Sequence, residues 1–230
     1  MGFAGGLQMS ELRSRVRGLF PLLLALGGCA PAVVETRPAV SVELTAEPEW
    51  HQVASPEDRD RIARINDAWT QALGEARAMG FRRAVLGEGE LLDPKAALPR
   101  PAPSPGPYRC RLVRLGTHGS SKGRGASAFT AFQPFFCYVE ADGPLLTIVK
   151  QTGSQRPAGW LYPDSDEKRL IFLGTLALGT EQAPMAYGEQ HDRDMGGVIE
   201  RVAPFRYRLV IPWPQTNSKL DVFELIPVTE

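Results

Sequence analysis

One segment, residues 150–163, gathers side chains that could bind a ligand between two turns rich in glycine and proline. Its sequence is KQTGSQRPAGWLYP, and its candidate binding residues are Ser154, Gln155, Arg156, Trp160 and Tyr162. The arginine could supply a forked cation, the serine and glutamine directional hydrogen bonds, and the two aromatic rings apolar faces. The alternative is a strand–turn–strand corner, in which Ser154 and Gln155 make turn hydrogen bonds and Trp160 belongs to the core.

A second segment, residues 187–194, could close the same end of the fold. Its sequence is YGEQHDRD, and its candidate residues are Tyr187, His191, Arg193 and Asp194. A hydrolytic triad could combine Ser154, His191 and either Asp192 or Asp194, although Ser154 lacks the second glycine of a nucleophile elbow. The alternative is a solvated cluster of paired charges. One histidine and two acids make a weak set of ligands, so we expect neither a metal nor a cofactor.

The strands that must position both segments begin at residue 108, where apolar residues start to alternate with polar ones. The expected strands cover about 108–116, 130–140, 145–152, 158–163, 169–178, 197–203, 206–213 and 220–228. Eight consecutive strands with short connections favour an eight-stranded antiparallel up-and-down barrel over 108–230, lipocalin-like in outline. A β-sandwich is the second choice. In the seventh strand, Tyr207 and Leu209 share one face, and Arg206 and Arg208 indicate that the other face meets water.

A helix and a strap precede the strands. Ser55 can cap a helix over 55–80, and one apolar stripe follows from Ile62 to Met79 at spacings of three or four. Residues 170–173 are apolar on both faces of their strand, so this stripe is expected to pack on the barrel. Alternating prolines over 91–107 predict an extended strap between the helix and the barrel.

Two cysteines, Cys110 and Cys137, lie in neighbouring expected strands at equal distances from a turn between Gly123 and Arg124. This spacing predicts a disulfide across a hairpin, with two free buried thiols as the alternative. A bridge requires an oxidising compartment.

The N-terminus predicts export to such a compartment. Three arginines precede a short apolar run, which ends at Leu26-Gly27-Gly28-Cys29. This motif resembles a bacterial lipobox and implies a signal peptide over 1–28, a lipid on Cys29 that includes palmitate or similar acyl chains, and a tether over 29–54. Ala30 favours the outer membrane, and Met9 is an alternative start. The competing interpretations are an ordinary signal peptide that is cut nearby and a buried helix.

Several segments together resemble an uncharacterised proteobacterial envelope family, domain of unknown function 4893. They include DRDRI (58–62), YRCR (108–111), TGSQRP (152–157), LYPD (161–164) and PWP (212–214), over a span of about residues 50–228. The resemblance implies an envelope domain without an assigned activity or cofactor, and it carries over no catalytic residue. Tyr207 stands where we expect the family to prefer tryptophan.

The chain is formally neutral, with 26 basic and 26 acidic residues, so we expect no nucleic-acid partner. The leading hypothesis is a non-enzymatic envelope lipoprotein that binds a small ligand or another envelope component. The alternatives are a periplasmic hydrolase using Ser154 or the His191 cluster, and an inhibitor of an envelope or host enzyme.

Overall fold

The computed structural model describes residues 49–117, 127–179, 181–215 and 218–228. The chain divides into two units, Met1–Glu43 and Leu44–Glu230, and the described residues belong to the second. The expected signal peptide, the expected lipidation site Cys29 and the expected tether as far as residue 48 lie outside the described residues.

Short helices come first along the chain. They are α1 (Trp50–Val53), α2 (Pro56–Ala63), α3 (Ile65–Ala78), α4 (Arg82–Gly87) and the 3-10 helix η1 (Gly89–Leu92). The sequence predicts one helix here, but the structure has two, α2 and α3. The helix is interrupted at Arg64, whose backbone leaves the helical conformation at φ −98° and ψ 20°. The expected cap is confirmed, since the Ser55 Oγ accepts a hydrogen bond of 3.1 Å from the Asp58 N–H.

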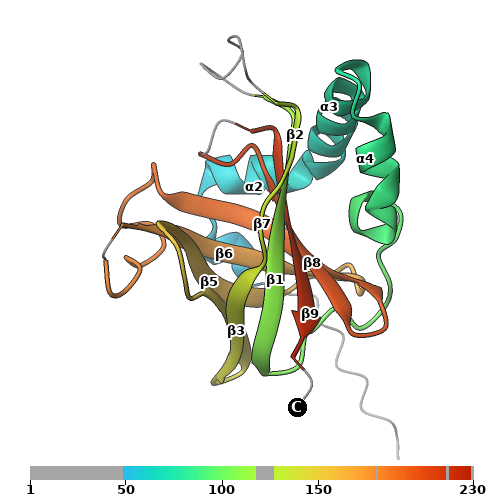
Figure 1. Ribbon diagram of the computed structural model, residues 1–230. Coiled ribbons are helices and arrows are strands. Elements are labelled where there is room, and N and C mark those ends of the chain that lie inside the picture. The colour runs from blue at the N-terminus through green and yellow to red at the C-terminus, as the bar shows by residue number, and fades with distance from the viewer. Residues whose placement is uncertain (1–48, 118–126, 180, 216–217, 229–230) are drawn as a thin grey trace, which may run out of the picture. The chain divides into compact units, whose positions relative to one another are not determined.

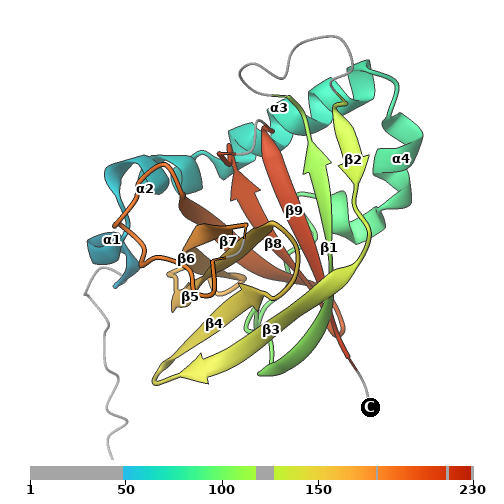
Figure 2. The ribbon, with the colours of Figure 1, turned by 60° about the vertical axis from the view of Figure 1, so that its left-hand side comes forward.

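The strands close into a barrel (Figures 1 and 2). They are β1 (Gly106–Leu115), β2 (Phe129–Ala131), β3 (Phe135–Asp142), β4 (Leu145–Lys150), β5 (Gln155–Pro163), β6 (Arg169–Leu178), β7 (Asp194–Ala203), β8 (Arg206–Pro212) and β9 (Leu220–Pro227). Successive strands from β3 to β9 pair antiparallel, and β1 pairs with both β3 and β9. The prediction of a mainly β, eight-stranded antiparallel barrel is confirmed.

One expected strand, 130–140, is divided into β2 and β3. Both lie along the same edge of β1, with β2 opposite Val113–Leu115 and β3 opposite Gly106–Cys110. Pro134 lies in the interruption, and proline has no N–H to donate to a ladder. The barrel proper therefore consists of β1 and β3–β9, and β2 is an additional short strand.

Apolar residues form two cores, one on each face of the barrel wall. The interior core includes Tyr108, Phe172, Ile199, Leu209, Phe223 and Leu225. The outer core joins the helices to outward-facing strand residues, among them Trp69, Leu73, Ile171, Leu173, Val198 and Val210. Figure 2 shows α1, α2 and α3 as an arc along the upper side of the barrel, with α4 at one end. Residues 171–173 are buried on both faces, as the sequence predicted.

The disulfide between Cys110 and Cys137 is confirmed, with the two Cα atoms 5.9 Å apart. Its register differs from the symmetric hairpin, because Cys137 lies opposite Tyr108 and Cys110 lies opposite Phe135. The bridge is therefore diagonal across the β1–β3 pair. Both cysteines belong to the interior core.

Candidate functional site

In the barrel interior, the described side chains pack closely. A cavity there is lined by Cys137, Ile148, Lys150, Pro157, Leu209, Phe223 and Leu225 and has a volume of about 10 Å³. That space holds about one water molecule. Candidate sites must therefore be sought at the ends and on the outside of the barrel.

The two segments singled out in the sequence do share one end of the barrel. The Gly179 N–H, in the loop after β6, donates a hydrogen bond of 2.9 Å to the Ser154 carbonyl in the β4–β5 turn. The Arg156 guanidinium donates to the carbonyls of Gly153 and Gly179, at 2.7 Å each, and also to the Glu181 carbonyl. Arg156 therefore fastens the turn to the loop and has few donors left for a ligand.

The two aromatic candidates on β5 lie elsewhere. Tyr162 is buried in the outer core, and Trp160 packs against the same core while its Nε1 donates to the Asp142 carboxylate at 3.0 Å. Ser154 and Gln155 line a separate pocket at the barrel end. The structure thus does not bring the five candidates of residues 150–163 into one site.

Three candidates from residues 187–194 meet the start of α2. The Tyr187 hydroxyl donates to the Asp58 carboxylate at 2.6 Å and accepts from the Ser55 N–H at 3.0 Å. The Asp194 carboxylate accepts from the Gly188 N–H at 3.0 Å and lies 3.1 Å from the His191 Nδ1. The two hydrogen bonds of Tyr187 attach the β6–β7 loop to the start of α2, and the two contacts of Asp194 lie within residues 188–194. The fourth candidate, Arg193, forms an ion pair of 2.6 Å with Glu181.

Asp58 is a buried carboxylate, only 1% exposed, and it is not among the candidate site residues that the sequence indicates. α2 can lie this close to β7 because β7 has Gly196 at the contact. A Cβ atom there would stand 2.8 Å from the Asp58 Cβ. Burial, together with the hydrogen bond to Asp58, raises the pKa of Tyr187, which further favours the protonated hydroxyl that donates this hydrogen bond.

Asp58 also positions Arg61 one helical turn later. The Arg61 Nη1 donates to the Asp58 Oδ1 at 2.9 Å, and the arginine side chain is 24% exposed. Within the described residues, the Arg61 Nε and Nη2 make no hydrogen bond. These two atoms form one edge of the guanidinium fork, which matches the two oxygens of a carboxylate or phosphate.

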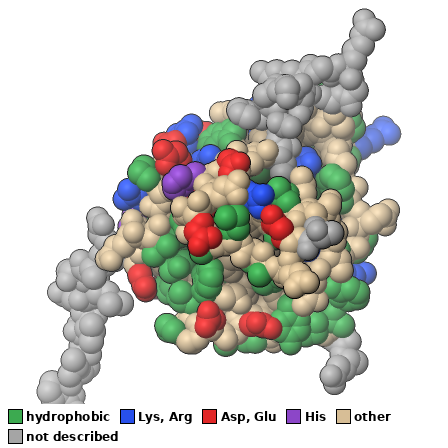
Figure 3. All heavy atoms as spheres, turned by 90° about the vertical axis from the view of Figure 1, so that its left-hand side faces the viewer, with side chains coloured by type: hydrophobic (Ala, Val, Ile, Leu, Met, Phe, Trp, Pro, Cys, Tyr) green, Lys and Arg blue, Asp and Glu red, His purple; other side chains and the backbone are tan. Residues whose placement is uncertain are grey.

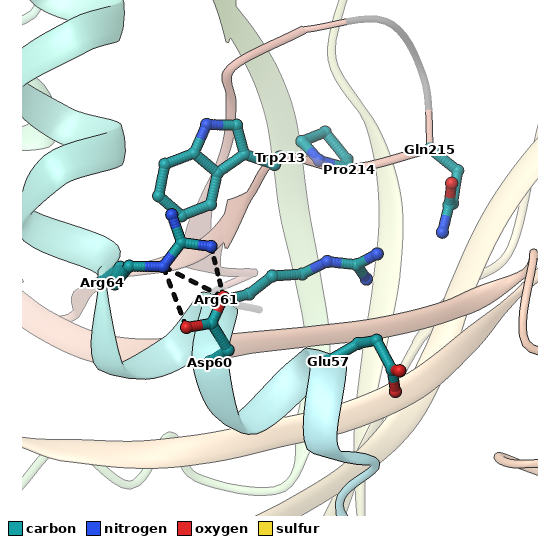
Figure 4. A pocket seen from close by; sticks show the side chains of 7 residues that line it. All are labelled: Glu57, Asp60, Arg61, Arg64, Trp213, Pro214 and Gln215. Atoms are coloured by element: carbon teal, nitrogen blue, oxygen red, sulfur yellow. Dashed lines mark hydrogen bonds and ion pairs between the residues drawn. The ribbon is translucent and has the colours of Figure 1, made fainter.

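Two pockets adjoin along α2, and both are lined by Glu57 and Arg61. The first, of about 460 Å³, is also lined by Asp60, Arg64, Trp213, Pro214 and Gln215 (Figure 4). The second, of about 380 Å³, is also lined by Ser55, Pro56, Asp58, His191 and Asp194. We call the two together the α2 groove. Figure 4 shows the Arg61 side chain extending across the first pocket below Trp213 and Gln215.

Trp213 forms an apolar wall of this groove. The Arg64 guanidinium lies over the indole, 4.7 Å from the ring centroid, and also forms an ion pair with Asp60. Trp213 has a φ of 41°, a left-handed backbone conformation that a bulky residue rarely adopts. Such strained residues are common at ligand sites.

Acidic, basic and apolar side chains are interspersed on the face of the molecule that Figure 3 shows. The described part of the chain contains no group of three or more His, Cys, Asp and Glu residues that could hold a metal ion. None of its helices is long and apolar enough to cross a membrane. Ser154 and His191 line different pockets.

We expect Tyr187→Phe to lower the free energy of unfolding by about 1.5–3 kcal/mol, because it leaves the buried Asp58 carboxylate without one of its donors. Urea unfolding followed by circular dichroism measures the loss. Tyr138→Phe is the matched control, since the half-buried Tyr138 hydroxyl makes no hydrogen bond to a described residue. Equal losses in the two variants would contradict this role of Tyr187.

A comparison with protein-family models matches residues 50–225 to the family described as a domain of unknown function, DUF4893. The match covers most of the chain, and the protein belongs to this family. The resemblance noted in the sequence is thereby confirmed at the level of the family. Neither a curated protein nor a solved structure matches the chain.

Proposed function

We propose that this protein is a non-enzymatic binding domain that holds a small molecule bearing a carboxylate or phosphate group in the α2 groove. The observation that carries the proposal is the guanidinium of Arg61. One of its nitrogens is fixed by a buried carboxylate, while its Nε–Nη2 edge makes no hydrogen bond to the described residues, in a wall shared by two pockets.

The Arg61 side chain is already ordered in the protein without a ligand. Asp58 is held by Tyr187, and Tyr187 in turn is held by the Ser55 backbone, so Arg61 keeps its position before a ligand arrives. Preorganisation of this kind raises affinity, because less side-chain entropy is lost on binding. Trp213 and Pro214 offer an apolar surface beside the cation, and Gln215 offers an amide.

We also propose that a lipid on Cys29 tethers the domain in the bacterial envelope. The lipid would lie in the outer membrane, and the domain would face the periplasm. The support is the N-terminal sequence, in which arginines, an apolar run and the lipobox-like LGGC follow one another. Mass spectrometry of the protein purified from membranes tests this. An N-terminal peptide that begins at an acylated Cys29 is expected, and a soluble protein with an unmodified Cys29 would overturn it.

We expect Arg61→Gln to weaken binding of a carboxylate ligand by about 10- to 100-fold, since a charge-assisted hydrogen bond contributes about 1.5–3 kcal/mol. Isothermal titration with a panel of sugar acids, short peptides and nucleotides identifies a ligand, and the variant is then titrated with it. Arg59→Gln is the matched control, because Arg59 lies on the same helix but outside the groove.

Arg61→Lys separates charge from geometry. Lysine keeps the ion pair with Asp58 possible but loses the planar fork, so weaker binding with unchanged stability is expected. Unchanged affinity in both Arg61 variants, or no binding of any panel member to the natural protein, would overturn the proposal.

A periplasmic hydrolase is the second candidate. The observation in its favour is the contact between the buried Asp194 and the exposed imidazole of His191, because a carboxylate can orient a histidine as a general base. Ester and glycoside substrates test it. Turnover that is abolished by His191→Ala, with Ser154→Ala as the second variant, would favour the enzyme.

A further inference from the structure

The pocket at the end of the barrel that Ser154 and Gln155 line has a volume of about 440 Å³, and we call it the barrel mouth. Its apolar wall consists of Leu112, Phe132 and Phe135, and its cations are Arg114 and Lys150. The β4–β5 turn adds the hydroxyls of Thr152 and Ser154. Neither pocket of the α2 groove is lined by any of these residues.

Lys150 forms the partition between the mouth and the packed interior, since it lines the interior cavity as well. Its ammonium donates a hydrogen bond of 2.8 Å to the Gln155 carbonyl and lies 4.3 Å from the centroid of the Phe135 ring. An ammonium has three protons to donate, so this position leaves capacity for another acceptor. Among the described residues, Lys150 forms no ion pair with a carboxylate.

The surroundings of Lys150 are unfavourable to its charge. Burial lowers its pKa below the usual value for lysine, and the positive charges of Arg156 and Arg114 lower it further. The Arg114 guanidinium is paired with the Asp221 carboxylate, with hydrogen bonds of 3.0 and 3.1 Å, and lies over the Phe132 ring at 5.3 Å. Arg156 faces the backbone carbonyls of the turn and loop.

Of the three cations, Arg114 is thus paired with Asp221, and Arg156 lies near the Glu181 carboxylate, whereas Lys150 forms no ion pair among the described residues. A half-buried ammonium with like charges for neighbours is costly unless an anion compensates it. A ligand carboxylate placed at Lys150 would supply that compensation, and Thr152 and Ser154 could donate to its oxygens. The part of the ligand behind the carboxylate would meet Leu112, Phe132 and Phe135.

We propose that the barrel mouth is a second binding site, independent of the α2 groove, for an organic anion with an apolar body. The class comprises aromatic carboxylates and medium-chain fatty acids. The anionic group is held by Lys150 with Arg114 behind it, and the apolar body lies against the leucine and the two phenylalanines. Phe132 is 40% exposed in the unliganded protein and would be covered on binding.

The test uses the full-length natural protein with benzoate and decanoate as probes and benzyl alcohol and decanol as uncharged matches. Isothermal titration and nuclear magnetic resonance shifts measure affinity. We expect both anions to bind at least about 10-fold more tightly than their alcohols, because only the anions pair with Lys150. Inorganic phosphate, which has no apolar body, is expected to bind more weakly than decanoate.

Lys150→Gln is expected to lower the affinity for benzoate and decanoate at least 10-fold, and Lys150→Arg to retain most of it. Because the glutamine removes a repelled charge, thermal melting is expected to show no loss of stability. Lys168→Gln is the matched control, since Lys168 is exposed in the β5–β6 turn. In Lys150→Gln, the nuclear magnetic resonance shifts that benzoate causes at residues 150–155 are expected to be lost, which locates this binding at the barrel mouth and separates it from the α2 groove.

Three results would overturn the proposal. The first is equal affinity for the anions and their alcohols, which would indicate apolar binding alone. The second is unchanged anion binding in Lys150→Gln with a normal melting temperature. The third is no binding of benzoate or decanoate at millimolar concentration.

Discussion

Arg208→Ala is expected to lower the free energy of unfolding by about 3–5 kcal/mol, the cost of breaking a buried ion pair from one side. Arg208 is fully buried beneath α3 and η1, with its guanidinium 4.9 Å from the Trp69 ring centroid. Its Nε donates to Glu200 at 2.7 Å, and its Nη1 donates to the carbonyls of Glu90, Leu91 and Asp93. The alanine would leave all four acceptors without their hydrogen bond from Arg208.

Urea unfolding monitored by circular dichroism measures this loss. Arg201→Ala is the matched control. Arg201 lies on the adjacent strand β7 and also donates to a carbonyl of the strap, that of Pro99, but these hydrogen bonds are exposed and its side chain is only half-buried. It is expected to cost about 0.5 kcal/mol or less. Similar costs for the two arginines would show that burial of Arg208 does not carry the effect.

Gly174→Ala is expected to destabilise the barrel by about 3 kcal/mol or more. Gly174 on β6 lies opposite Gly159 on β5. A Cβ atom at Gly174 would stand 2.2 Å from the Ala158 carbonyl oxygen and 2.6 Å from the Phe172 ring. The nearest of these atoms belongs to the backbone of the paired strand, so relief would require the two strands to separate.

Gly74→Ala is the opposite case. Gly74 lies within α3, and its added Cβ would meet nothing within 4 Å, so the alanine is expected to stabilise the protein by about 0.5–1 kcal/mol. Thermal melting of both variants, with soluble yield recorded for Gly174→Ala, distinguishes them. A normal melting temperature for Gly174→Ala would contradict the tight β5–β6 contact.

The strand pattern was readable because each apolar side chain at every second residue must face a core, and turn residues mark the ends. The same reasoning was wrong for Arg208. Alternation correctly places Arg208 on the face opposite Tyr207 and Leu209. That face is not in water, because η1 and the first residues of the strap cover it. No periodicity within one strand can reveal a cover built from residues more than a hundred positions away.

The candidate site was predicted in part for a similar reason. Tyr187, His191 and Asp194 were selected as chemistry-bearing residues in one loop, and the structure places them around one pocket or directly behind it. Asp58 and Arg61 are not among the candidates that the sequence indicates, since charged residues in the first turns of a helix look alike in sequence whether they stabilise the helix or bind a ligand. The close approach of α2 to Gly196, which buries Asp58 against β7, is a tertiary contact that the sequence of the helix does not reveal.

The pairing of β1 with β9 has a consequence for how the chain is made. Arg111 and Glu224 are partners across this pairing and are separated by 113 positions. The backbone groups on one edge of β1 therefore have no β-sheet partner until β9 has been synthesised. Contacts this distant slow folding and expose an incomplete edge during synthesis. A nascent chain that lacks β9 would be a substrate for chaperones. Deletion of β9 alone would open the barrel, so even a short C-terminal truncation would be strongly destabilising.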